Sequence, residues 1–183
     1  FNLNELSEYV YKYINKTEVY GGIDYTTFGK QIEDSICEAL IGYFKEKKLL
    51  TTHKIAPTKN DFPDFELNGS YAFEIKAAWN KSNPENDMGT LNSWDKKLDF
   101  YKDDIYYIFV KYNCGDDGTV IGIDAVYIDN VYNFIGKNGD GYLKYREKDG
   151  NLRPKSWNDF SSNKSYVANY SDFRKQLAET DDY

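Results

Sequence analysis

The amino-acid sequence predicts an α/β fold with a central mixed β-sheet flanked by helices. Its 183 residues are enough for one domain with a sizeable core, so we expect a single domain over residues 1–183. Hydrophobic residues make up 40% of the chain and charged residues 29%, a balance typical of chains that fold. Apolar patterns follow one another in the order helix, hairpin, helix, strand, strand, helix, which favours one mixed sheet with helices packed on it.

Two helices are expected near the start of the chain. Residues 3–14 carry aliphatic side chains at helical spacing. The pair Gly21-Gly22 predicts a loop over residues 15–27. The clearest helix spans residues 28–47, because its apolar side chains line one face and the lysines near its end suit the helix dipole.

A hairpin is expected next. Residues 64–67 and 71–77 have strand character, and Asn68-Gly69 lies between them. Asn-Gly between apolar-rich runs is a strong hairpin signal, because both central positions of a tight turn need positive φ. A long polar loop is expected over residues 78–92.

The middle of the chain predicts a short helix and two strands. Ser93 is expected to cap a helix over residues 94–102. Residues 104–112 form a dense run of β-branched and aromatic side chains, which indicates a buried central strand. After a turn, residues 120–128 are expected to form another strand.

The last part of the chain has weaker patterns. Asp129 is expected to cap a short helix that ends near Gly136. Residues 137–165 are rich in Gly and polar side chains, which predicts loops. Ser171 is expected to cap a final helix over residues 172–179.

Composition argues against several protein classes. No run reaches the roughly 18 apolar residues of a membrane span, and we expect neither a membrane segment nor a signal peptide. Cys37 and Cys114 are too few for a disulfide scaffold and lack metal-ligand spacing, which favours a cytoplasmic protein. The net charge of −7 argues against nucleic-acid binding, but residues 137–164 hold seven Lys or Arg against four Asp or Glu, a local charge of +3.

Three side chains of the predicted hairpin have the pattern of a metal-dependent phosphodiesterase site. Glu74 and Lys76 are two residues apart and share one face of a strand, while Ile75 points the other way into the core. The tight turn would place Asp64 beside Glu74. Two carboxylates, with the Ile75 carbonyl as a third ligand, suit Mg²⁺, and Lys76 can orient or help deprotonate an attacking water.

The plain alternative is that Glu74 and Lys76 form an exposed cross-strand pair without a catalytic role. Three features favour the catalytic interpretation: Pro63-Asp64 at a suitable distance upstream, a hairpin signal between the two halves, and core-like flanking residues. A strand so apolar on one side is expected to be central, and a central strand seldom carries unexplained charges.

Pro63-Asp64, nine further residues and then Glu74-Ile75-Lys76 resemble the signature of the PD-(D/E)xK nuclease superfamily. The element order over residues 28–128 is similar to the core of that superfamily, so the expected fold is a restriction-endonuclease-like core. Within the superfamily, the size of the chain and its loop-rich C-terminal half look most like a type II restriction endonuclease.

The resemblance implies a Mg²⁺-dependent enzyme that hydrolyses phosphodiester bonds of double-stranded DNA at a specific sequence. Asp64 and Glu74 would bind one or two Mg²⁺, and Lys76 would position the attacking water, giving 5′-phosphate and 3′-hydroxyl ends. By family analogy we expect a homodimer with one active site for each strand of a palindrome. Residues 129–183 would supply DNA-recognition and C-terminal elements.

The family also often places an acidic residue on the helix before the hairpin. Glu33 lies at the edge of the apolar face of the expected helix, on one stripe with Cys37. Glu33 is therefore a candidate for a metal contact through a water. The alternative is a carboxylate at the rim of the helix, paired with Lys30 or Lys47.

Side chains outside the hairpin are candidates for DNA contact, because Lys and Arg neutralise phosphates and polar side chains bind base edges. The candidates near the long polar loop are Lys81, Asn92 and Ser93. The candidates in the basic C-terminal region are Lys144, Arg146, Arg153 and Lys155. The alternative for both sets is an ordinary solvated loop.

Two other function classes stay open. A nuclease of the same fold could act as a Holliday-junction resolvase, a repair nuclease or a nuclease toxin. A chain with an acidic pI and many tyrosines could also be a non-enzymatic protein-interaction module. Zinc sites, serine hydrolases and NTPases lack support, since His53 is the only histidine and neither G-x-S-x-G nor a P-loop sequence occurs.

Overall fold

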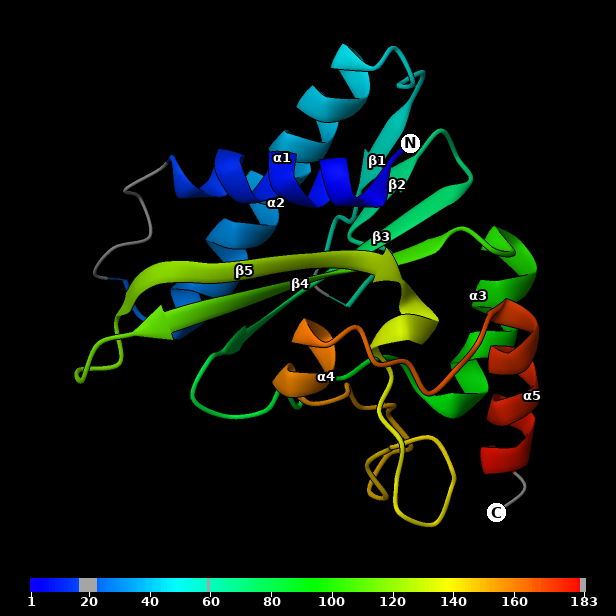
Figure 1. Cartoon of the computed structure of the whole chain (residues 1–183). Helices are drawn as coiled ribbons and strands as arrows, with labels where there is room; N and C mark the ends of the chain where they lie inside the picture. The colour runs from blue at the N-terminus through cyan, green and yellow to red at the C-terminus, as the bar shows by residue number, and fades with distance from the viewer. Residues whose placement is uncertain (17–22, 59, 182–183) are drawn as a thin grey trace.

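The computed structural model describes residues 1–16, 23–58 and 60–181. Within these residues, five strands form one mixed sheet in chain order, with only the β3–β4 pair parallel (Figure 1). The strands are β1 (His53–Ile55), β2 (Phe65–Leu67), β3 (Tyr71–Trp79), β4 (Ile105–Cys114) and β5 (Val120–Asn130). The predicted mixed sheet is confirmed, and the exposed edge strand β1 is an addition to it.

Helices cover both faces of this sheet (Figure 1). They are α1 (Leu3–Asn15), α2 (Tyr25–Glu46), the 3₁₀ turn η2 (Leu91–Ser93), α3 (Trp94–Tyr101), the 3₁₀ turn η3 (Val131–Phe134), α4 (Trp157–Ser161) and α5 (Tyr170–Asp181). Side chains of α1 and α2 form one hydrophobic core with the first face, and side chains of α3, η3, α4 and α5 form a second core with the other face. No helix of the described ranges is both long and apolar enough to cross a membrane.

The alternation of side chains along β3 decides which face carries the charged residues. Phe73 and Ile75 belong to the core under α1 and α2, whereas Ala72 belongs to the core under α3. Successive side chains of a strand point to opposite faces, so Glu74 and Lys76 point to the α3 side of the sheet.

Helix α2 begins three residues earlier than the predicted start. The side chain of Asp24 accepts hydrogen bonds from the backbone N–H groups of Thr26 and Thr27, both at 2.9 Å. This N-cap satisfies donors that the first helical turn would otherwise leave unpaired. The expected loop over residues 15–27 is therefore wrong at its end, and residues 17–22 of it lie outside the described residues.

Ser93 stands at the predicted N-cap position of α3, but neither Ser93 nor Asp129 makes the predicted side-chain cap, because a 3₁₀ turn occurs at each place. Ser93 lies at the end of η2, and its hydroxyl donates to the Thr90 carbonyl at 2.8 Å instead of capping α3. Asp129 accepts the backbone N–H of Asn130 at 2.7 Å, and the short 3₁₀ turn that follows has no side-chain cap.

The cap predicted for the last helix is also displaced. Ser171 lies inside α5, which begins one residue before it. Asn169 serves as the cap, since its side-chain oxygen accepts the N–H of Asp172 at 2.8 Å. Asn and Ser are both good N-caps, so the sequence alone does not choose between neighbouring polar residues.

The hairpin forms as predicted, with one residue more in its connection. Asn68 and Gly69 both have positive φ, 54° and 73°, as the tight turn requires. Leu67 pairs with Tyr71, so Ser70 also belongs to the connection. Because Phe65 pairs with Phe73 in the same register, the residue before the strand, Asp64, falls opposite Glu74.

The loop after β3 is bound to the C-terminal half and is not a free surface loop. Met88 is buried, and its N–H donates to the Leu152 carbonyl at 2.9 Å. The N–H of Leu152 in turn donates to the Gly89 carbonyl at 2.9 Å. The segment around Leu152, expected to be loop, is therefore ordered by pairing with the loop that precedes α3.

Candidate active site

The carboxylates of Asp64 and Glu74 each accept a hydrogen bond from a backbone N–H of the other segment of the hairpin. The side chain of Asp64 is buried, with 8% of its surface exposed, and its Oδ2 accepts the backbone N–H of Ile75 at 2.7 Å. The Oε1 atom of Glu74 accepts the backbone N–H of Asp64 at 3.0 Å. These reciprocal hydrogen bonds fix both carboxylates at the point where β2 and β3 separate.

Lys76 completes the cluster. Its Nζ lies 3.5 Å from Oε2 of Glu74, and the two side chains are 23% and 13% exposed. The pair is therefore mostly shielded from water and differs from the solvent-facing pair considered as the alternative. The structure brings Asp64, Glu74 and Lys76 together, as the sequence predicted.

The electrostatics of the cluster favour a bound cation. Burial raises the pKa of Glu74, and the negative charge of Asp64 raises it further, while the ammonium of Lys76 opposes both. Two carboxylates this close repel each other, and a cation between them would remove the repulsion. The described residues contain no cluster of three or more His, Cys, Asp or Glu side chains that could hold a metal ion, so this donor set has two carboxylates.

The backbone of Ile75 can supply a further oxygen. Its N–H points to Asp64, and the N–H and C=O of one strand residue point to the same side. The Ile75 carbonyl therefore faces the edge of β3 that β2 leaves open. Two carboxylates, one carbonyl and several waters fit the donor chemistry of Mg²⁺, which prefers oxygen ligands and keeps part of its water shell.

Glu33 of α2 lies beside this edge. It lines a pocket of about 230 Å³ with Asp64, and a second pocket of about 170 Å³ with Ile75 and Lys76. Burial raises the pKa of Glu33, and the charge of Asp64 adds to the effect. Glu33 thus shares one pocket with Asp64 and another with Lys76, both of which belong to the cluster.

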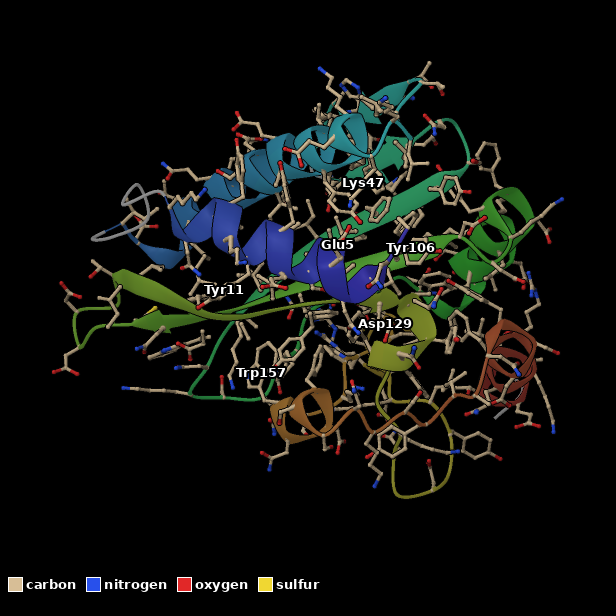
Figure 2. All side chains as sticks on the ribbon, turned by 45° about the horizontal axis from the view of Figure 1, so that its top comes forward. Glu5, Tyr11, Lys47, Tyr106, Asp129 and Trp157 are labelled. Atoms are coloured by element: carbon tan, nitrogen blue, oxygen red, sulfur yellow. The ribbon has the colours of Figure 1, made fainter. Side chains whose placement is uncertain are left out.

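The lysines considered as partners of Glu33 bind other carboxylates. Lys30 pairs with Asp34 at 3.6 Å. Lys47 pairs with Glu5 of α1 at 2.7 Å (Figure 2). Neither lysine therefore forms an ion pair with Glu33, and its nearness to Asp64 and Lys76 supports a role at the metal site.

One lysine of this region was not among the residues predicted from the sequence. Lys97 of α3 places its Nζ 4.5 Å from the centroid of the Phe62 ring and 4.7 Å from that of the Trp94 ring. Burial lowers the pKa of Lys97 to about 8, while the charge of Glu74 raises it. The signal was present in the sequence, because Lys97 follows the core residue Trp94 by three positions and so lies on the same side of the helix.

The candidates for DNA contact near the motif lie beside Lys97. Asn92 and Ser93 line an open groove of about 620 Å³ together with Lys96, Lys97 and Phe100. The groove runs along α3, on the face of the sheet to which Glu74 and Lys76 point. Lys81 is exposed, and its Nζ lies 5.5 Å from the centroid of the Trp79 ring.

The arginines of the basic region are neutralised within the chain. Arg153 is only 12% exposed and lies 3.2 Å from a carboxylate oxygen of Asp87. Arg146 contacts Asp149 and also lies 3.6 Å from Asp87. Both arginines therefore hold the loop before α3 against the C-terminal half. Lys144, between these segments, is half-buried.

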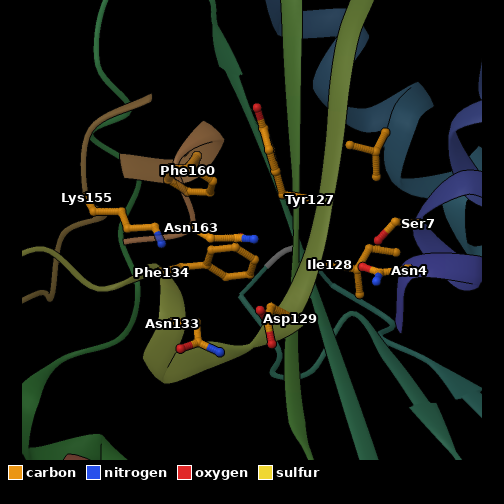
Figure 3. Close-up of a pocket in the computed structure, with 11 residues that line it drawn as sticks. Asn4, Ser7, Tyr127, Ile128, Asp129, Asn133, Phe134, Lys155, Phe160 and Asn163 are labelled. Atoms are coloured by element: carbon orange, nitrogen blue, oxygen red, sulfur yellow. The ribbon is translucent and has the colours of Figure 1, made fainter. Parts of the chain in front are cut away.

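Lys155 is a core residue, which corrects its assignment to the DNA-contacting surface. Its side chain is 5% exposed, and Nζ donates to the Lys164 carbonyl at 2.6 Å and lies above the rings of Phe134 and Phe160. It lines a cavity of about 290 Å³ next to β5 together with Asp129 (Figure 3). None of the hairpin carboxylates lines this cavity.

Comparisons with known proteins agree with this geometry. The sequence model of the NgoBV restriction endonuclease family matches residues 25–181, a range that contains α2, the whole sheet and α5. A solved structure, the NlaIV restriction endonuclease, has a similar fold, with a TM-score of 0.61 and 22% sequence identity over 86% of this chain and 65% of that chain. The match thus covers slightly less than two thirds of that protein. No curated protein matches the sequence.

The expected resemblance to restriction endonucleases and the expected fold are therefore confirmed. The family match covers most of the chain and contains Asp64, Glu74 and Lys76. The chain belongs to the NgoBV restriction endonuclease family.

Proposed function

We propose that this chain is a type II restriction endonuclease that uses Mg²⁺ to hydrolyse double-stranded DNA at a specific sequence. The observation that carries the proposal is the cluster at the end of the hairpin. The buried Asp64 and the mostly buried Glu74 each accept a backbone N–H from the other segment of the hairpin, and the Lys76 ammonium lies 3.5 Å from Glu74. Family membership supports a nuclease, and the cluster supplies the chemistry that such an enzyme needs.

Each residue of the cluster has a role in this proposal. Asp64, Glu74 and the Ile75 carbonyl hold Mg²⁺, which when bound stabilises the charge that develops on the phosphate oxygens. Lys76 orients the attacking water. As the water oxygen bonds to phosphorus, the bond to the 3′ oxygen breaks, leaving a 5′-phosphate and a 3′-hydroxyl. Glu33 of α2, which lines pockets with Asp64 and with Lys76, contacts the metal site through a water.

The DNA lies along α3 in this proposal. Asn92 and Ser93 line the groove there, and Lys81 and Lys144 contact the backbone from the flanking segments. Arg146 and Arg153 instead order the loop that carries the groove, because Asp87 neutralises both. Residues 28–128 supply the catalytic core, and residues 129–183 supply elements that support DNA recognition.

We further infer a cytoplasmic homodimer. The buried Cys37 and Cys114 are free thiols, which fits a reducing compartment. A palindromic site presents two equivalent strands, and a two-fold dimer places one active site on each. Sedimentation of the protein with and without DNA measures this state, and a monomer in both conditions would contradict it.

The experiment that tests the function is cleavage of mixed genomic DNA with Mg²⁺, run beside EDTA and the Lys76→Ala protein. We expect discrete bands that disappear in both controls, and sequencing of the ends then gives the site. Cleavage of a four-way junction in preference to linear DNA would indicate a resolvase instead. A well-folded protein that cleaves no DNA or RNA would contradict the enzyme assignment.

A further inference from the structure

Helix α3 presents one lysine toward the sheet. Trp94, Leu98 and Tyr101 are buried on the inner side of this helix. Lys97 is three residues after Trp94 and four before Tyr101, so its side chain leaves the helix at the margin of the same side. The neighbouring Lys96 is exposed, whereas Lys97 is only partly accessible.

The ammonium of Lys97 lies against two aromatic rings. It lies over the Phe62 ring at 4.5 Å and over the Trp94 ring at 4.7 Å. Trp94 is held in turn, because its Nε1 donates to the Met88 carbonyl at 3.0 Å. A Cβ atom added at Gly89 would lie 2.7 Å from Nζ of Lys97, so the absence of a side chain at Gly89 leaves room for the ammonium.

Both rings beside Lys97 are connected to the strands that carry the carboxylates. Phe62 precedes Asp64 by two residues. The Trp94 ring packs against Tyr107 at 6.4 Å between centroids, and Tyr107 is the partner of Glu74 in the β3–β4 pair. The charges of Glu74 and Lys76 both act on the pKa of Lys97, as expected for groups that share one site.

Lys97 differs from Lys76 in its charge partners. Lys76 pairs with Glu74, whereas no carboxylate of the described residues lies within 4.0 Å of Lys97. A partly buried cation without an anion is unfavourable, and an incoming anion would stabilise it. The groove of about 620 Å³ along α3 gives DNA a path to this ammonium.

We propose that Lys97 is a second lysine of the active site, which binds a non-bridging oxygen of a DNA backbone phosphate next to the scissile bond. The two rings hold its ammonium in place before DNA arrives, so little side-chain freedom is lost on binding. The inference rests on the proposed nuclease function and adds a substrate contact to it. Lys76 acts on the attacking water, and Lys97 acts on the affinity for DNA.

The test is single-turnover cleavage of a duplex that contains the mapped site, measured against enzyme concentration at several salt concentrations. The variants are Lys97→Met and Lys97→Arg. Met keeps an apolar stem on the two rings and removes the charge, and Arg keeps the charge. The matched control is Lys175→Ala, an exposed lysine on α5.

For Lys97→Met we expect the half-saturating enzyme concentration to rise about tenfold, the loss expected for one hydrogen bond to a charged group. The plot of log affinity against log salt has a negative slope. Its magnitude should fall by about 0.9, the value for one phosphate contact. The rate at saturation should change less than for Lys76→Ala. Lys97→Arg should restore the salt slope, and Lys175→Ala should match the wild type.

A folded Lys97→Met protein with the wild-type half-saturation and salt slope would overturn the inference while leaving the nuclease function intact. If Lys97→Met does not fold, Lys97→Gln is measured in its place with the same expected losses, and Lys97→Arg remains the charged control. A wild-type protein that cleaves no DNA would remove the proposed function and this inference together.

Discussion

Two regions of this molecule hold a lysine over aromatic rings, one buried and one partly buried, and the two ammonium groups differ in their partners. Lys155 lies above Phe134 and Phe160, and its ammonium donates to the Lys164 carbonyl. Lys97 lies above Phe62 and Trp94, next to a carboxylate cluster, without an ion pair among the described residues. Burial lowers the pKa of both lysines.

The same contrast extends to the surrounding charges. In the C-terminal region, Asp87 neutralises Arg146 and Arg153. At the hairpin, Asp64 and Glu74 repel each other, and the charge of Asp64 raises the pKa of Glu74. Charges whose partners lie within the chain stabilise the fold, whereas charges left partly uncompensated are available to a metal ion and a phosphate.

The largest effect is expected for Asp64→Asn. Asn keeps an oxygen that can accept the Ile75 N–H, so the hairpin should still form, but one metal-binding charge is lost. Single-turnover cleavage should fall by about 10³-fold or more. Asp87→Asn, a matched change in the compensated region, leaves the metal-binding carboxylates in place and should cost far less cleavage, and equal losses in both variants would remove the distinction between the regions.

The second-largest effect is expected in the pH dependence of the free energy of unfolding, measured without Mg²⁺. The pKa of Glu74 rises from 4.5 to about 8 in the folded chain, so its contribution to stability is fully present below 4.5 and is lost as pH rises through 8. Glu74→Gln should remove this dependence and make the metal-free protein more stable than the wild type at pH 8. Urea unfolding in EDTA at pH 5 and pH 8 measures it, and a Gln variant less stable than wild type at pH 8 would count against charge repulsion at the hairpin.

Lys155 and Lys97 give a paired comparison. Lys155→Met should leave the half-saturating concentration and the salt slope of cleavage unchanged, because its ammonium binds a backbone carbonyl of this chain. Lys97→Met should weaken binding about tenfold. The same single-turnover series measures both, and a salt slope that falls in the Lys155 variant would place that lysine on DNA after all.

The smallest effect is expected for the ion pairs of the C-terminal region. Asp87 is half exposed, so loss of its charge in Asp87→Asn should lower the free energy of unfolding by about 1 kcal/mol or less. Thermal unfolding measures it, with Asp116→Asn in an exposed turn as the control. A loss of several kcal/mol would mean that these pairs contribute far more than partly exposed ion pairs usually do.

The local part of this architecture could be predicted from the sequence. Asn68-Gly69 and the alternation around Glu74 are short-range signals, and they place Asp64, Glu74 and Lys76 together. Edge strand β1 escaped prediction, since three exposed residues carry no periodic pattern. Cap positions also shifted, because several neighbouring polar residues can cap a helix equally well.

The long-range part could not be predicted in the same way. Arg146 and Arg153 pair with Asp87 because the loop before α3 docks on their segment, a tertiary contact that a basic stretch does not reveal. Lys155 is buried for a similar reason, since the carbonyl that it binds lies nine residues later. Charge in a sequence window therefore overestimates the charge available to a partner.

The central claim is that the two carboxylates of the hairpin, only partly compensated by Lys76, bind a divalent cation. The most direct test is thermal unfolding of the wild type and of Asp64→Asn at pH 8, in EDTA and in millimolar Mg²⁺. A ligand that binds only the folded state stabilises it, so Mg²⁺ should raise the melting temperature of the wild type and leave that of Asp64→Asn nearly unchanged. A wild type insensitive to Mg²⁺, or equal shifts in both proteins, would contradict the claim.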